Sequence, residues 1–212
     1  MIRLAFITGT APGKWFRRYA HATTHRLTTI DADDACGVLL AGEADVALTR
    51  LPDARIGDEF HTVVLYDEEP GVAVPKESVY AEVGEAVRMA DLADEHVNEH
   101  TTTEELRAAL QVVAANVGVA FAPRPLLKVL SKKRVVPLGV RDWPGETTSI
   151  GLVWRKEDDS DAIQDFVGIA KGRTPNSSRA AAPRRNAKEK RLAKEARRKA
   201  SKPQNRGSRK RR

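Results

Sequence analysis

The sequence is poor in the features that mark disulfide-bonded, membrane-spanning and secreted proteins. Cys36 is the single cysteine among 212 residues, so no intramolecular disulfide can form, which suits a reducing compartment. Because Cys36 lies beside Ala35 and close to Val38 and Leu39, we interpret it as a buried apolar side chain rather than a nucleophile. No run of about 18 apolar residues exists, and the opening MIRLAFITGT lacks the apolar core of a signal peptide. We therefore expect a cytoplasmic protein without a membrane partner.

Catalytic and cofactor motifs are missing as well. The sequence has no P-loop, no G-x-G-x-x-G after a predicted strand and no G-x-S-x-G elbow. Its five histidines include no H-E-x-x-H pair, although His96 and His100 are four residues apart, near Glu95 and Glu99. These four residues form either a metal site or a solvated loop, and we favour the loop. The sequence thus predicts no catalytic residue, no metal and no cofactor, and a protein that is not an enzyme.

Charge is divided unevenly along the chain. Residues 172–212 contain 17 Lys and Arg and two Glu, a net charge of +15, which leaves residues 1–171 at −8. The last segment has too few apolar residues to offset its ordering entropy, so we expect a disordered tail. It lacks aromatic residues for base stacking, so any DNA or RNA binding would be non-specific phosphate contact. A solubilising tail, or one that pairs with the acidic body, is the alternative. The basic residues predicted to contact nucleic acid are Arg184, Arg185, Lys190, Arg191, Arg197, Arg198, Arg209 and Arg211.

Alternating apolar stretches and helical patterns predict an α/β domain over residues 1–171. The expected strands of its first part are 3–7, 26–30, 45–48 and 60–66, with helices after Pro12 and after Asp33 or Asp34. This β-α-β-α-β-β order predicts a mostly parallel sheet. Later strands are expected at 71–75, 119–122, 134–138 and 149–154, and helices at 124–130 and after 158–161.

A second lobe is predicted between two chain crossings, near 70–75 and 142–149. Its main helix opens at Thr101–Glu105, where either Thr101 with Glu104 or Thr102 with Glu105 fits the capping-box spacing. The apolar face of this helix is expected to comprise Leu106, Leu110, Val113 and Val117. Two crossings between two lobes form a hinge, and the cleft between the lobes is the default ligand site.

The stretch Gly42–Pro52 (GEADVALTRLP) carries the clearest functional signal. A helix ends at Gly42, a short buried strand follows, and Thr49 and Arg50 come just at its carboxyl end. In open α/β sheets ligand crevices form at this end of the strands. A hydroxyl and a guanidinium there indicate recognition of a small anionic molecule. An ordinary surface loop with a solvated arginine is the alternative.

Five segments in order resemble the effector-binding (substrate-binding) domain of LysR-type transcriptional regulators. They are Ile2–Ala5, Leu40–Leu48, Met89–Glu95, Val117–Pro123 and Gly151–Trp154. The resemblance covers nearly all of residues 1–171 and implies a two-lobed type 2 periplasmic-binding-protein-like α/β fold. Lobe I would comprise 1–72 and 148–171, and lobe II 73–147. Few residues separate Glu95 from Thr101, so the second lobe is expected to be abridged. The family's amino-terminal winged helix-turn-helix is not found in this sequence.

The resemblance also implies which residues surround the ligand. They come from three polar segments and comprise Thr8, Gly9, Thr10, Thr49, Arg50, Thr101, Thr102 and Thr103. Two of these segments precede helices, whose free amides and dipoles favour an anion. The alternative is that the threonines only cap helices.

These observations predict a cytoplasmic regulatory domain that binds a small anionic metabolite, without its own sequence-specific DNA-binding domain. The resemblance suggests a homodimer formed through a helix and a strand of the first lobe, including Trp15–Tyr19 or its neighbourhood. The alternative is a nucleic-acid-associated accessory protein that acts through its basic tail and has a vestigial cleft.

Overall fold

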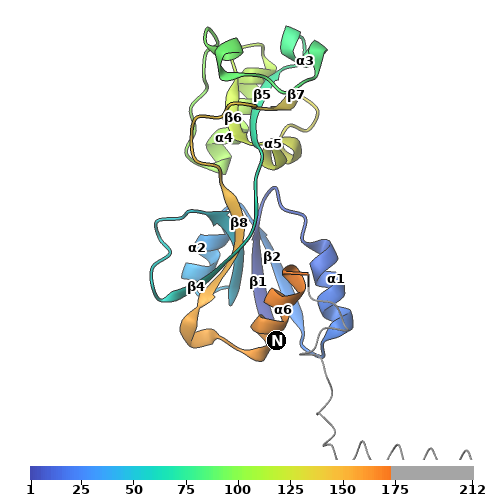
Figure 1. Ribbon diagram of the computed structural model, residues 1–212, viewed down its shortest axis with the longest axis vertical. Helices are drawn as coiled ribbons and strands as arrows, with labels where there is room; N and C mark the ends of the chain where they lie inside the picture. The colour runs from blue at the N-terminus through green and yellow to red at the C-terminus, as the bar shows by residue number, and fades with distance from the viewer. Residues whose placement is uncertain (173–212) are drawn as a thin grey trace, which may run out of the picture. The chain divides into compact units, whose positions relative to one another are not determined.

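Residues 1–172 are described by the computed structural model, and the tail residues predicted to contact nucleic acid lie outside this range. The first lobe is built on a five-stranded sheet with the order β2-β1-β3-β8-β4 (Figure 1). Its strands are β1 (Ile2–Ile7), β2 (Leu27–Ala32), β3 (Val46–Leu51), β4 (Phe60–Asp67) and β8 (Ser149–Arg155). β1 runs parallel to β2 and β3, as the βαβ pattern predicts, whereas β8 is antiparallel to both β3 and β4.

Three helices cover this sheet: α1 (Gly13–Ala22), α2 (Ala35–Leu40) and α6 (Asp161–Ala170). Strand β3 is buried almost throughout, which explains the apolar run Val46–Leu48 at its start. Tyr19 of α1 and Phe166 of α6 are fully buried and pack edge to face. The Tyr19 hydroxyl donates a hydrogen bond to the Ala162 carbonyl at 3.0 Å. Tyr19 therefore belongs to the core of the first lobe, and the predicted dimer contact around Trp15–Tyr19 stays a prediction.

The second lobe contains a three-stranded antiparallel sheet with the order β6-β5-β7. Its strands are β5 (Pro70–Pro75), β6 (Ala120–Pro123) and β7 (Val135–Gly139). Its helices are α3 (Val79–Val83), the 3-10 helix η1 (Met89–Leu92), α4 (Thr103–Ala114) and α5 (Arg124–Leu130). The first lobe also contains a 3-10 helix, η2 (Lys156–Asp158), which follows β8. Leu106, Leu110 and Val113 of α4 are buried against β5 and α5. This arrangement confirms the predicted two-lobed α/β fold class.

Two segments connect the lobes, one between β4 and β5 and one between β7 and β8 (Figure 1). By sheet membership the second lobe begins at Pro70, so the first crossing is shorter than expected. The boundaries 1–72, 73–147 and 148–171 stay predictions. None of the helices within residues 1–172 is long and apolar enough to span a membrane.

In the second lobe one local prediction is wrong and one helix was not predicted. Val117 does not belong to the apolar face of α4, because the helix ends at Ala114 and Val117 is 47% exposed. Helix α3 was not predicted, because its five residues are too few to establish a helical period.

Candidate functional site

A cleft with a volume of about 610 Å³ lies between the two lobes. This volume is in the range of small-molecule sites. The first lobe contributes the ends of β1 and β3 and the residues that follow β2 and β3, and the second contributes the start of α4 and part of β6 and α5. The polar residues on its wall are Asp33, Asp34, Thr49, Arg50, Asp53, Arg55, His100, Thr101, Thr102, Thr103 and Glu104. Five of the eight residues predicted to bind ligand are among them.

Arg50 faces this cleft but is already paired with a carboxylate. Its Nε donates to Glu68 Oε2 at 2.7 Å, and its Nη2 donates to Glu68 Oε1 at 3.1 Å. The Glu68 side chain is only 1% exposed and also accepts a hydrogen bond from Thr148 Oγ1 at 2.9 Å. Glu68 leads into the first crossing and Thr148 ends the second. The pair therefore joins strand β3 to the hinge, and Arg50 does not offer the free positive charge that the sequence suggested.

The segment Thr8–Thr10 lies behind Arg50 rather than on the cleft wall. The Thr8 carbonyl accepts a hydrogen bond from Arg50 Nη2 at 3.1 Å, and the Thr10 hydroxyl donates to the Ile7 carbonyl at 2.7 Å. Gly9 has a φ of +97°, and an added Cβ would lie 2.8 Å from Arg50 Nη2 and 3.0 Å from the Leu126 Cα. Glycine is needed here because the first lobe passes close to α5 of the second. The predicted role of these three residues in ligand binding stays a prediction.

Thr101, Thr102 and Thr103 all line the cleft, and two of them are used by the helix cap. Thr102 Oγ1 accepts from the Glu105 amide, and Glu105 Oε2 accepts from the Thr102 amide, both at 3.1 Å. Glu105 Oε2 also accepts from the Thr101 hydroxyl and amide, and these hydrogen bonds lower the pKa of Glu105. Of the two predicted capping boxes, Thr102 with Glu105 is therefore correct. The Thr103 side chain forms no hydrogen bond within residues 1–172.

Thr49 differs from the other predicted threonines. It lies on β3 next to Arg50, is 2% exposed and still forms part of the cleft wall. Its hydroxyl has no hydrogen-bond partner in the described part of the chain, although its backbone is paired with Gly151 of β8. Among the described residues, the one fully buried side-chain nitrogen or oxygen without a hydrogen-bond partner is Arg124 Nε. The Thr49 hydroxyl is therefore not sealed in the core but retains some exposed surface. Thr49 is thus the predicted residue best placed to contact a ligand.

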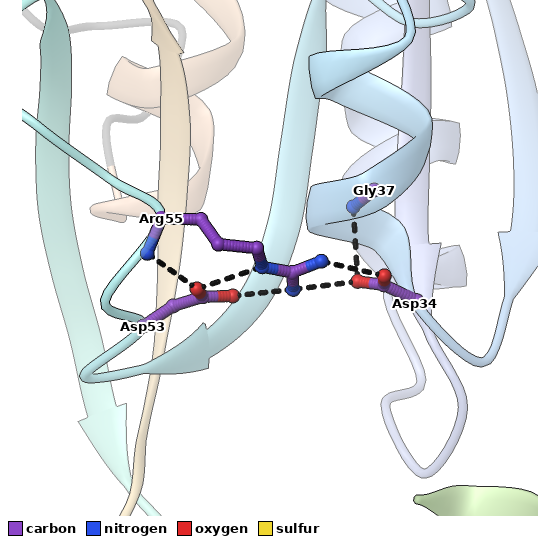
Figure 2. Close-up of polar contacts among 4 residues, drawn as sticks. All are labelled: Asp34, Gly37, Asp53 and Arg55. Atoms are coloured by element: carbon purple, nitrogen blue, oxygen red, sulfur yellow. Dashed lines mark hydrogen bonds and ion pairs between the residues drawn. The ribbon is translucent and has the colours of Figure 1, made fainter.

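Sequence reasoning missed a charged group on the first-lobe rim of the cleft. Figure 2 shows the Arg55 guanidinium between the carboxylates of Asp34 and Asp53. Arg55 Nη1 and Nη2 donate to Asp34 at 2.7 and 2.9 Å, while Nε and Nη2 donate to Asp53 at 2.9 and 2.6 Å. Asp34 also caps α2 by accepting from the Gly37 amide. The only sequence signal for this group is that Asp53 and Arg55 follow closely after Pro52.

The carboxylates of Asp34 and Asp53 remain negatively charged at neutral pH. Hydrogen bonds from Arg55 lower the pKa of Asp53 to about 2 and also lower the pKa of Asp34. Cys36 lies next to them, and burial followed by the charge of Asp53 raises the pKa of its thiol to about 11. A thiol with so high a pKa is a poor nucleophile, as predicted from its apolar neighbours.

An ion pair links the two lobes across the cleft. Arg107 of α4 donates to Asp33, which follows β2, at 2.5 and 2.8 Å. Asp33 Oδ1 also accepts from the Thr8 hydroxyl at 2.7 Å. The hydrogen bonds from Arg107 lower the pKa of Asp33, and the bond from Thr8 lowers it further. No sequence signal connects Asp33 with Arg107, because 74 positions separate them.

The histidine pair considered at the sequence level does not act as a unit. His100 Nε2 lies 2.7 Å from the Phe121 carbonyl, to which it donates, and the His96 carbonyl accepts from the Val119 amide. Within residues 1–172 no group of three or more metal-ligating side chains lies close together.

A second cavity, beside Glu68, Phe121, Trp143 and Thr148, has a volume of only about 100 Å³. It is below the usual size of a small-molecule site.

Comparison with solved structures finds the same fold in regulatory proteins. The effector-binding domain of a BenM variant superposes with a TM-score of 0.62 at 18% identity, over 80% of this chain and 92% of that one. The effector-binding domain of QuiR in complex with shikimate gives a TM-score of 0.60 at 17% identity, over 80% and 94%. An OxyR mutant from Corynebacterium glutamicum gives 0.56 at 17% identity, over 80% and 62%. At these identities the likeness establishes the fold alone.

Family membership follows from the sequence itself. No curated protein matches the chain. The family model described as the LysR substrate binding domain matches residues 14–97 and 95–175, most of the chain. The matched segments include β3, the start of α4 and both crossings between the lobes, which together form the cleft. The chain therefore belongs to the LysR substrate-binding domain family.

Proposed function

We propose that this protein is a regulatory domain that binds a small-molecule effector in the cleft between its lobes. The observation that carries the proposal is Thr49, a residue only 2% exposed on the wall of a cleft of about 610 Å³, whose hydroxyl has no hydrogen-bond partner within residues 1–172. Membership in a family of effector-binding domains supports it, as does the similarity to the QuiR domain, whose structure contains shikimate. The function is sensing rather than catalysis, and we place it in the cytoplasm and in the regulation of transcription.

Ligand binding would act by a shift in lobe arrangement. A molecule that contacts β3 of one lobe and α4 of the other stabilises the arrangement in which both contacts form. The Asp33–Arg107 ion pair already joins the same two surfaces. Because it is exposed, such a pair contributes only about 0–1 kcal/mol, so a ligand with a few good contacts would control the equilibrium.

A thermal-shift screen of the 212-residue chain with a metabolite library tests the proposal. A ligand at 100 times its dissociation constant stabilises the folded state by about 2.7 kcal/mol. For a domain of this size that corresponds to a rise in Tm of roughly 5–11 °C. Replacing Thr49 by valine, which keeps the volume and removes the hydroxyl, should reduce the shift. Replacing Glu43, an exposed carboxylate outside the cleft, by glutamine serves as the matched control. If no compound stabilises the parent chain, the proposal is wrong.

The predicted anionic character of the ligand does not form part of this proposal. Arg50 and Arg55, the two guanidinium groups on the cleft wall, are both paired with carboxylates. The absence of a sequence-specific DNA-binding domain stays a prediction as well. So does the homodimer, for which the buried Tyr19 offers no contact surface.

A second candidate function is non-specific nucleic-acid binding through the tail. The observation in its favour is the net charge of +15 over residues 172–212. If about ten of these charges contact DNA phosphates, the log–log dependence of affinity on salt should have a slope near −9. Fluorescence anisotropy with a labelled duplex at several salt concentrations measures this slope. A slope near zero would exclude the tail as a nucleic-acid contact.

A further inference from the structure

The charge balance of the interlobe cleft selects a class of ligand, and this inference rests on the proposed function. Carboxylates on or directly behind its wall outnumber guanidinium groups five to three. The carboxylates are those of Asp33, Asp34, Asp53, Glu68 and Glu104, and the guanidinium groups are those of Arg50, Arg55 and Arg107. Glu105 adds one more negative charge at the start of α4.

None of the three guanidinium groups is free to receive an anion. Arg50 is bound to Glu68, Arg55 to Asp34 and Asp53, and Arg107 to Asp33. An anionic ligand that recruited Arg50 would leave the almost fully buried Glu68 without its charge partner. Separating one partner from a buried ion pair is strongly unfavourable. An anionic ligand that recruited Arg55 would leave the carboxylates of Asp34 and Asp53 without their charge partner, and both would repel the ligand.

Acceptors, in contrast, remain available on the same wall. The Glu104 carboxylate lies at the second position of α4, is exposed, and forms no hydrogen bond within residues 1–172; the positive charge of Arg107 acts on it only at longer range than an ion pair. On the opposite lobe, the hydroxyl of the buried residue Thr49 has no hydrogen-bond partner in this part of the chain and can accept as well as donate. An ammonium group carries three donors, and its hydrogen bonds to carboxylates are charge-assisted.

We infer that the effector is a small molecule that carries at least one protonated amine and has no net negative charge. Its amine binds among Thr49 of the first lobe and Glu104 of the second, with Asp33 nearby on the rim. A ligand held in this way reduces the excess of negative charge between the lobes. It thereby weakens the repulsion between the negative charges of the two lobes. Amine binding and lobe closure are therefore coupled.

Matched probes of opposite charge test the inference. Isothermal titration of the 212-residue chain compares putrescine with succinate, and L-lysine with L-glutamate. The variants are Thr49→Val and Glu104→Gln, with Glu43→Gln as the matched control at an exposed carboxylate outside the cleft. We expect at least one amine to bind, with affinity reduced about tenfold in Glu104→Gln, as expected for loss of one charge-assisted hydrogen bond. The control variant should bind like the parent. Anion binding to the basic tail is recognised because neither cleft variant changes it.

Each other outcome overturns the inference. Binding of succinate or L-glutamate that depends on Thr49, without binding of the amines, would show an anion site and leave the proposed function intact. Amine binding that neither cleft variant changes would place the amine elsewhere, and failure of both amines to bind would contradict the inference directly. The proposed function fails separately, when no compound of any charge in the wider metabolite library stabilises the chain.

Discussion

Replacing Arg50 by alanine is expected to destabilise the protein, and this effect separates a structural role from ligand binding. The sequence suggested a guanidinium free to bind an anion, and its removal would then reduce only ligand affinity. In the structure Arg50 is 15% exposed and bound through two hydrogen bonds to Glu68, which is 1% exposed. Its removal leaves the buried carboxylate with one hydrogen bond from Thr148 and no opposite charge.

The size of the effect follows from this geometry. Removing one partner of a buried ion pair costs about 3–5 kcal/mol. Because Arg50 is partly exposed and Thr148 still donates to Glu68, we expect a loss near the lower limit, about 3 kcal/mol. This lowers the Tm by roughly 6–12 °C for a domain of this size. Urea unfolding followed by circular dichroism, without ligand, measures the change. Arg17→Ala, at an exposed arginine on α1, is the control and should change stability by less than about 0.5 kcal/mol.

A double variant tests the cause of the loss. Replacing Arg50 by methionine and Glu68 by leucine removes both charges and fills similar volumes. Replacing a buried ion pair in this way is often neutral or stabilising, so the double variant should be more stable than Arg50→Ala. If Arg50→Ala unfolds within about 1 kcal/mol of the parent, the reasoning about Glu68 is wrong. If the double variant is no more stable than Arg50→Ala, the loss does not come from an unpaired carboxylate.

Two further predictions concern the capping box of α4 and the charged group around Arg55. Thr102→Ala should lower the free energy of unfolding by about 1 kcal/mol, whereas Thr102→Ser, which keeps the hydroxyl, should not change it. Scanning calorimetry measures both variants. An equal loss in both would mean that the hydroxyl does not cap the helix. Because Arg55 lowers the folded-state pKa of Asp53 from 3.8 to about 2, its stabilising effect is complete above pH 3.8 and is lost as the pH falls toward 2. The Tm difference between the parent and Arg55→Met should therefore shrink over this interval, and a difference that does not change with pH would contradict the assignment.

The order of the elements could be predicted because each is encoded by neighbouring residues. The cap of α4 depends on Thr102 and Glu105, which are three positions apart, so the start of the helix was visible in the sequence. The start of strand β3 is buried on both faces, and its apolar run Val46–Leu48 indicates this directly. Where the local pattern was too short, as in α3, prediction failed. The end of α4 was also misjudged, because Val117 continues the apolar spacing beyond the last helical residue.

By itself the sequence determined the two-lobed fold, the family, and two of the three segments predicted to border the cleft, those at Thr49–Arg50 and Thr101–Thr103, because hydrophobic periodicity and caps act over a few residues. The charge state of the cleft was decided only by the tertiary structure. Arg50 and Glu68 are 18 positions apart, and Asp33 and Arg107 are 74 apart. Such pairs form when strands and lobes come together, so sequence spacing does not reveal which charges are compensated. The same packing left Thr49 on a buried strand with no hydrogen-bond partner for its hydroxyl among residues 1–172, and thereby distinguished it from Thr102, which caps a helix.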